Sequence, residues 1–349
     1  MNRPEYFIGI DIASESFTVA AGQMRGKEWK IVAGPVSFRN EYDGFPSFKE
    51  WMRRNQLLPD DVIICMEATG VYNEVLAHYL AVNQYVVVIQ SPLQVKRAFK
   101  PVGHKTDPVD SCQISEYTYR HYDELVPWKP RDEVLEQIKV LLSSREQFSV
   151  QCAAHQNILR ALKRKANRSE FAEKIHTDAI DHLRKVIRSI EQEIERLIDQ
   201  NPHFGQTIGL LMTIPGVGLI LSAHMLIILE GTQQSFSPKE LAAFIGICPY
   251  EHQSGSSIHR PATSRHYGPG SLRRLLFLAA LTSRVNNPSF KQYFFRKVIE
   301  GKPKKLVINN IANKLLKIMC AVVNSRTPYI PNYRSVNPLL LQKGALTKS

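Results

Sequence analysis

The chain has 349 residues, 44% of them hydrophobic and 22% charged, and this composition excludes a disordered or low-complexity protein. Its length exceeds one ordinary hydrophobic core and predicts two or three folding units. Because it has no run of eighteen apolar residues and no basic leader followed by an apolar segment, we expect a cytoplasmic protein without an export signal or membrane span.

Positive charge is concentrated in the last quarter of the sequence. The formal net charge is +13, yet residues 254–349 alone carry seventeen Lys and Arg against one acid, Glu300. A field of one sign on this scale indicates a polyanionic partner, and nucleic acid is the commonest one. We therefore expect contact with nucleic acid and a nucleoid-associated location. A solvated basic face and an RNA-binding tail unrelated to catalysis are the alternatives.

Residues 1–120 predict an α/β unit. Three segments rich in β-branched and aromatic residues, 6–12, 16–21 and 29–38, are joined by short links and predict a meander of three strands. They are followed by a predicted helix (47–54), strand (62–66), helix (71–82) and strand (85–89). This is the element order of a ribonuclease-H-like fold, and the apolar runs of the later strands suit burial on both faces. A short basic helix from Pro92 and a loop over 100–106 come next. Asp107 as N-cap and Pro108 as first helical residue predict a helix to about residue 119.

Residues 132–200 predict two long helices. Apolar residues repeat at alternating spacings of three and four between 180 and 197, which is a heptad seam. A weaker apolar series between 141 and 162, interrupted by Arg145 and His155, is its potential partner. The two helices either pair within one chain or dimerise the protein, and the sequence leaves both possibilities open.

Residues 204–330 predict a mainly α-helical unit. The stretch Ile214-Pro215-Gly216-Val217-Gly218 lies between two helical patterns and resembles the hairpin of a helix-hairpin-helix element, where Gly216 and Gly218 let backbone amides approach a phosphate. Ser237-Pro238-Lys239-Glu240 has the form of a capping box for a helix that ends near residue 245. A polar loop is expected over 249–270, helices over 271–284 and 304–324, and an extended tail over 327–349.

The five cysteines form no Cys-x-x-Cys pair and no group with histidine at zinc spacing. They are expected to be buried free thiols in a reducing compartment: Cys65, Cys112, Cys152, Cys248 and Cys320.

Four acids fall at positions where chemistry is the better explanation. Asp11 lies in the first predicted strand, and Glu67 ends an apolar strand. Asp107 and Asp110 are three residues apart at a helix start, so they share one face. Burying such charges without a partner or a metal is costly, and oxygen-only ligands favour Mg²⁺ or Mn²⁺ over zinc. Two such ions clamp the attacking and leaving oxygens of a phosphoryl displacement. Taken singly, Asp107 and Asp110 are equally explained as a cap and a first-turn acid.

The sequence resembles the DEDD insertion-sequence transposases, the insertion-sequence one-ten family of bridge-RNA-guided recombinases. The resemblance covers nearly the whole chain. Its N-terminal motifs are Ile8-Gly9-Ile10-Asp11, Glu67-Ala68-Thr69-Gly70 and Lys105-Thr106-Asp107-Pro108-Val109-Asp110. Its C-terminal motifs are the 214–218 hairpin, Ala242-Ala243-Phe244-Ile245-Gly246, Ser254-Gly255-Ser256-Ser257 and Gly270-Ser271-Leu272-Arg273-Arg274.

The resemblance implies a RuvC-like domain (1–125) whose acids bind magnesium, a coiled-coil or dimerisation segment (130–203), a C-terminal transposase domain (204–330) and a tail (331–349). It implies that Ser254 attacks a DNA phosphodiester and forms a covalent phosphoserine link. It further implies donor and target DNA and a guide noncoding RNA as partners. The assembly it implies is a homodimer or homotetramer, in which acids of one subunit meet the serine of another.

Candidate nucleic-acid contacts surround these motifs. The basic candidates could neutralise a phosphate, and the guanidinium fork of arginine suits that role. His252, His259 and His266 flank the serine and could shuttle protons, although packed or solvated histidines are commoner. The candidates are Lys105, Gly216, Gly218, Arg260, Arg265, Arg273 and Arg274.

Three other functions compete with this interpretation. A RuvC-type junction nuclease would use water as nucleophile and leave Ser254 incidental. A plain nucleic-acid-binding protein would need none of the acids. An actin-like or sugar-kinase ATPase shares the Ile8–Asp11 strand, but it needs Gly and Thr after Asp11 and a second glycine-rich phosphate loop, which the sequence lacks.

Overall fold

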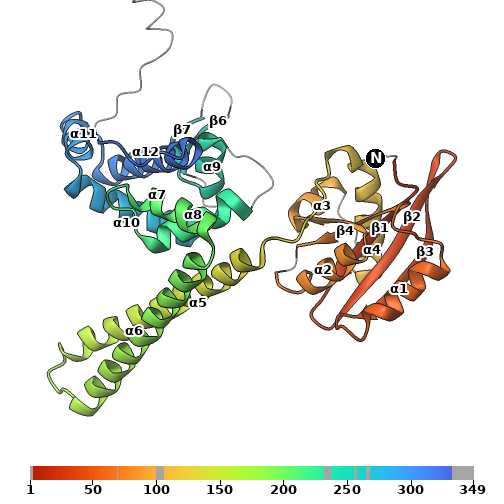
Figure 1. Cartoon of the computed structure of the whole chain (residues 1–349), viewed down its shortest axis with the longest axis horizontal. Coiled ribbons are helices and arrows are strands. Elements are labelled where there is room, and N and C mark those ends of the chain that lie inside the picture. The colour runs from red at the N-terminus through yellow and green to blue at the C-terminus, as the bar shows by residue number, and fades with distance from the viewer. Residues whose placement is uncertain are drawn as a thin grey trace, which may run out of the picture. The chain divides into compact units, whose positions relative to one another are not determined.

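The structure is a computed structural model that describes residues 3–68, 70–99, 106–231, 237–254, 258–264 and 268–331. The chain divides into two compact units, Met1–Pro130 and Arg131–Ser349 (Figure 1). The division of the second unit near residue 203 and the boundaries of the tail stay predictions.

A five-stranded mixed sheet forms the first unit, with strand order β3-β2-β1-β4-β5. Strands β1 (Tyr6–Ile12), β2 (Ser16–Arg25) and β3 (Glu28–Arg39) form the antiparallel meander, and β4 (Val62–Glu67) and β5 (Val86–Gln90) extend it in parallel with β1. The helices are α1 (Phe45–Arg54), α2 (Glu74–Val82), α3 (Pro92–Ala98) and α4 (Asp107–Arg120), and the 3-10 turn η1 covers Tyr122–Glu124. The predicted ribonuclease-H-like α/β fold is therefore confirmed.

Two apolar clusters cover the two faces of this sheet, because successive residues of a strand point to opposite sides. Ile8, Ile10, Ile64 and Met66 pack with residues of α1 and α2 in one cluster. The alternate residues, including Phe7, Ile63 and Cys65, pack with Ile114 and Tyr117 of α4 in the other. The sheet is thus buried on both faces, as its apolar strands predict.

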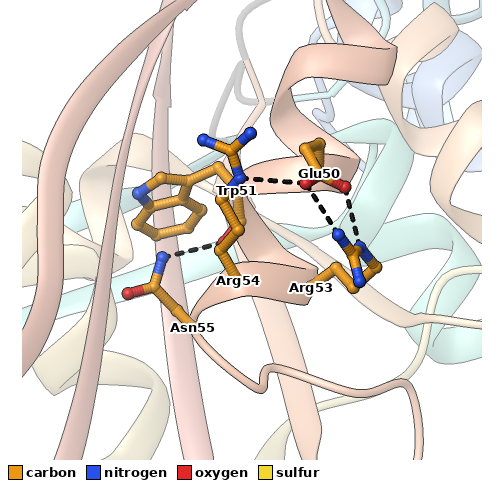
Figure 2. A network of polar contacts seen from close by, with 5 residues as sticks. All are labelled: Glu50, Trp51, Arg53, Arg54 and Asn55. Atoms are coloured by element: carbon orange, nitrogen blue, oxygen red, sulfur yellow. Dashed lines mark hydrogen bonds and ion pairs between the residues drawn. The ribbon is translucent and has the colours of Figure 1, made fainter.

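Side-chain hydrogen bonds stabilise the exposed face of α1 near its end. Glu50 accepts hydrogen bonds from the guanidinium groups of Arg53 and Arg54 at 2.8–2.9 Å, and Asn55 donates to the Trp51 carbonyl (Figure 2). The hydrogen bonds from Arg53 and then Arg54 lower the pKa of Glu50 to about 2. Both arginines therefore have an acidic partner within their own helix.

The second unit begins with two 30-residue helices, α5 (Glu133–Leu162) and α6 (Glu170–Asp199), which lie side by side (Figure 1). Their seam contains Cys152, Ile180 and Leu183 towards the connecting turn and Leu142, Ile194 and others towards the open end. Arg145 donates to Glu191 across the seam at 2.7 Å. The two helices with the heptad pattern therefore pair within one chain, which is the first of the two arrangements that the sequence allowed.

The rest of the unit is a mainly helical bundle, as predicted. Its elements are α7 (Pro202–Met212), α8 (Leu219–Gly231), α9 (Pro238–Ile245), β6 (Pro249–Ser254), β7 (Ile258–Ser264), α10 (Gly270–Asn286), α11 (Pro288–Ile299) and α12 (Lys304–Ser325). The capping box of α9 is present, since the Ser237 hydroxyl accepts from the Glu240 amide and the Glu240 carboxylate from the Ser237 amide.

Two local predictions are wrong, and one helix has no counterpart in the sequence analysis. The segment expected to be a polar loop over 249–270 contains an antiparallel hairpin, β6 with β7, which backbone hydrogen bonds hold without an apolar alternation in the sequence. Helix α11 was not predicted, although its N-cap Asn287, whose side chain accepts from the amides of Ser289 and Phe290, is followed by proline. The N-cap of α4 is Thr106, and Asp107 is its first helical residue.

Helix α12 is the core helix of this bundle. Within the described residues it is the one helix whose length and composition would allow it to cross a membrane, but half of its apolar stretch is buried inside the protein. Val307, Ile311, Leu315 and Met319 belong to the cluster that joins α7–α12.

All five cysteines are free thiols, with Cys65, Cys152 and Cys320 buried and the other two partly exposed. Burial raises the pKa of Cys65 to about 12.

Candidate functional site

Asp11 and Glu67 lie side by side at the carboxyl ends of two neighbouring parallel strands. Ile10 of β1 is opposite Met66 of β4, so the next residues in register are the two acids. Ile10 and Met66 face the α1 and α2 side of the sheet. Because side chains alternate along a strand, Asp11 and Glu67 both face the α4 side.

Helix α4 lies directly on β1 at Gly9. A Cβ atom on Gly9 would lie 2.2 Å from the Ser111 carbonyl oxygen and 2.2 Å from the Ser115 amide nitrogen. The Ser115 hydroxyl donates to the Phe7 carbonyl at 2.6 Å. Residues of β1 that lie nearer to Asp11 therefore contact residues that lie nearer to the start of α4. This arrangement brings the first turn of α4 to the carboxyl end of β1.

The four acids thus lie at one edge of the sheet, with Asp107 and Asp110 in the first turn of α4. Asp11, Glu67 and Asp110 are half-buried and Asp107 is exposed. Among the residues that the structure describes, no three His, Cys, Asp or Glu side chains are close enough together to hold a metal ion. The backbone therefore gathers oxygen donors suited to a hard divalent cation, while their side chains do not surround a common point.

Polar residues that the sequence analysis missed support this edge. The Asn40 amide donates to the carbonyls of Ala13, after β1, at 3.0 Å and of Tyr72, after β4, at 2.9 Å. Gln90 ends β5 beside Glu67 and donates to the Tyr117 hydroxyl of α4 at 3.2 Å. Gln90 follows an apolar strand in the same way as Glu67, so that pattern could have identified it; Asn40 follows no such pattern.

Ser254 is the last residue of β6, and its register partner is Ile258 of β7. It therefore belongs to the last pair of the described β6–β7 ladder. The hairpin also carries His252 opposite Arg260 and His259 opposite Gln253. The side chains of these residues lie outside the described part of the structure, as do Lys105, Arg265 and His266 altogether.

The 214–218 hairpin joins α7 to α8. Gly216 has a φ of 89°, and a Cβ there would lie 2.5 Å from the Ser283 hydroxyl and 2.9 Å from the Ala279 carbonyl oxygen of α10. Ser283 also donates to the Pro215 carbonyl at 2.6 Å. Gly216 is therefore needed for packing on α10, whereas a Cβ on Gly218 would meet no described atom within 4 Å. A phosphate contact by either residue stays a prediction.

The two arginines of the Gly270–Arg274 motif already have partners within the protein. Arg273 donates to the Ile245 carbonyl at 2.8 Å and to the Gly268 carbonyl at 3.4 Å, and so ties α10 to the end of α9. Arg274 forms an ion pair with Glu146 of α5. Any contact of Arg274 with a phosphate competes with that carboxylate.

A half-buried histidine lies near the Glu146 carboxylate of this ion pair. Desolvation lowers the pKa of His224 on α8, the Glu146 charge opposes this change and the Arg145 charge adds to it, so that the resulting pKa is about 4. The imidazole is therefore neutral at physiological pH. Its place in an apolar helix gave no signal of this environment, because the charged neighbours come from α5.

This strand order, with acids at the ends of two parallel strands and on the helix that covers them, defines a ribonuclease-H-like carboxylate domain. Residues 8–166 match the model for the DEDD domain of IS110 elements, described as "Transposase". Residues 209–294 match the model described as "Transposase IS116/IS110/IS902 family". The chain belongs to this family of transposases, enzymes that cut and recombine DNA.

Individual relatives agree with the family models. The pilin gene-inverting proteins of Moraxella lacunata and Moraxella bovis are each 30% identical over 326 residues, 93% of this chain and 97% of theirs. A 43.6 kDa protein of insertion element IS110 from Streptomyces coelicolor is 28% identical over 41% of this chain and 34% of its own. The T. thermophilus RuvC in complex with a Holliday junction substrate is 12% identical, with a TM-score of 0.27, over 36% of this chain and 99% of that one.

Proposed function

We propose that the chain cuts and rejoins DNA of a mobile element through a covalent phosphoserine intermediate formed by Ser254. The observation that carries the proposal is the register of β1 and β4, which brings Asp11 beside Glu67 on the face covered by α4. Asp11, Glu67, Asp107 and Asp110 would hold a divalent cation, magnesium or manganese, after a closing movement of their side chains. When bound, the cation would stabilise the negative charge that develops on the phosphate.

The reaction of the serine balances without an external cofactor. The Ser254 oxygen forms a bond to phosphorus and loses its proton, while the bond from phosphorus to one deoxyribose oxygen breaks and that oxygen gains a proton. The reverse step joins a new strand end and releases the serine. The name of the Moraxella relatives supports this chemistry, because inversion of a gene requires that cut strands are rejoined and hydrolysis does not rejoin them.

A guide RNA and an assembly of two or four copies, in a cytoplasmic nucleoid-associated location, complete the proposal. The basic C-terminal quarter supplies the charge for both nucleic acids. The α5–α6 hairpin keeps apolar side chains exposed near its turn, Phe171 at 75% and Ile175 at 50%. Such side chains are suited to contact with a second copy.

The test is a purified full-length protein incubated with donor DNA and Mg²⁺, with adducts resolved by denaturing electrophoresis. We expect a metal-dependent protein–DNA adduct that is lost in Ser254→Ala and in Asp11→Asn, and RNA that co-purifies with the wild type. Ser189→Ala, at an exposed position of α6 outside the family motifs, is the control and should keep the adduct. Continued strand cutting by Ser254→Ala would reject the serine mechanism in favour of a nuclease that uses water.

A further inference from the structure

Helices α11 and α12 form a pocket of about 430 Å³ in the bundle of the second unit. Its volume falls within the range of small-ligand sites. Its lining combines two aromatic rings, two cations, a hydroxyl and an amide, and it contains no acid: Ser289, Phe290, Gln292, Tyr293, Arg296 and Lys314.

Both cations of the pocket lie against the Tyr293 ring. The Lys314 ammonium is 4.4 Å from the ring centre and the Arg296 guanidinium carbon is 5.8 Å from it. These cation–π contacts hold an ammonium and a guanidinium beside one aromatic surface. Lys314 comes from α12 and Tyr293 and Arg296 come from α11, so tertiary packing creates the group.

The positive charge of this group is little compensated. Glu300 is the one acid of residues 254–349. Its carboxylate is 2.6 Å from the Lys297 ammonium and farther, 4.0 Å, from the Arg296 guanidinium. Lys297 and Arg296 therefore share this one carboxylate, which leaves the pocket with a positive charge that attracts an anion.

We propose that this pocket binds one nucleotide of an unpaired nucleic-acid strand, with its phosphate at Lys314 and Arg296 and its base against Tyr293. A basic groove interleaved with aromatic rings is the usual way in which proteins hold single strands, because every base has a face that can stack. The proposal rests on the proposed function in that it needs a nucleic-acid partner, but it does not need Ser254 chemistry.

The experiment measures binding of the full-length protein to single-stranded DNA and RNA oligonucleotides of one sequence by fluorescence anisotropy over a range of salt. Tyr293→Leu should weaken binding about tenfold, and Tyr293→Phe should keep it, because stacking needs only the ring. Lys314→Gln should reduce the slope of log affinity against log salt by about 0.7, the value for one phosphate on a single strand. The stronger of the DNA and RNA arms identifies the strand that is bound.

Lys317→Gln is the matched control, because Lys317 is exposed on the same helix but does not line the pocket. It should change affinity less than Lys314→Gln does. Equal losses in the two lysine variants, or unchanged binding by Tyr293→Leu, would overturn the pocket and leave only a general basic field. Loss of oligonucleotide binding by the pocket variants, with no Ser254 adduct in the wild type, would keep the pocket and reject the serine mechanism.

Discussion

The carboxylate edge of the first unit and the arginine motif of the second unit use their motif residues differently. At the edge, strand register and the packing of α4 on Gly9 bring the motif acids to one side of the sheet. In α10, Arg273 bonds backbone carbonyls of the neighbouring α9 region and Arg274 pairs with Glu146. A motif therefore locates an element reliably, but the partner of each side chain decides whether that residue faces a ligand or holds the fold.

The largest expected effect comes from breaking the close contact at the edge. Gly9→Ala places a Cβ 2.2 Å from two backbone atoms of α4, so the helix must move away from β1. We expect a loss of about 3 kcal/mol or more in the free energy of unfolding of the first unit, and loss of metal-dependent cleavage. Urea unfolding and the adduct assay measure the two effects.

Gly209→Ala is the control for that variant, because it lies within α7 and a Cβ there would meet no described atom within 4 Å. It should be neutral or stabilising by up to about 1 kcal/mol, the helix propensity difference between the two residues. A Gly9→Ala protein with wild-type stability and cleavage would contradict the close approach of α4.

An intermediate effect is expected from His224 beside the arginine motif. Its folded pKa of about 4 lies below the unfolded value of 6.5, so the unfolded state binds more protons between these values. Stability of the second unit should therefore fall as pH decreases from about 6.5 to about 4, by up to about 3 kcal/mol. Urea unfolding of wild type and His224→Gln across this range measures the difference in slope. A steeper acid loss in the variant would contradict the assignment.

The smallest effect is expected from the Glu146–Arg274 pair, whose side chains are 29% and 49% exposed. Glu146→Gln should cost less than about 1 kcal/mol of stability, because solvent screens a pair of this exposure. It should also increase affinity for donor DNA a few-fold at low salt, since the Arg274 guanidinium becomes available to a phosphate. Glu195→Gln removes the same charge at an exposed position of the neighbouring helix α6, so an equal increase there would mean that only net charge matters.

Patterns that repeat along the chain were predictable, and contacts between distant segments were not. The strand of residues 6–12 and the capping box at Ser237 follow from local rules and were predicted correctly. The β6–β7 hairpin was not, because cross-strand hydrogen bonds hold it and its polar residues show no alternation. The structural roles of Gly216 and Arg273 were missed for the same reason, since their partners lie in other helices.

By itself the sequence determined the order of elements in residues 1–120, the heptad seam and the concentration of positive charge after residue 254. These properties depend on side chains a few residues apart, whose periodicity is set by helix and strand geometry. Only the tertiary structure decided that Asp11 and Glu67 face the same helix, that α5 pairs with α6 in one chain and that Lys314 meets Tyr293. Each of these depends on packing between segments far apart in the sequence, which local periodicity does not specify.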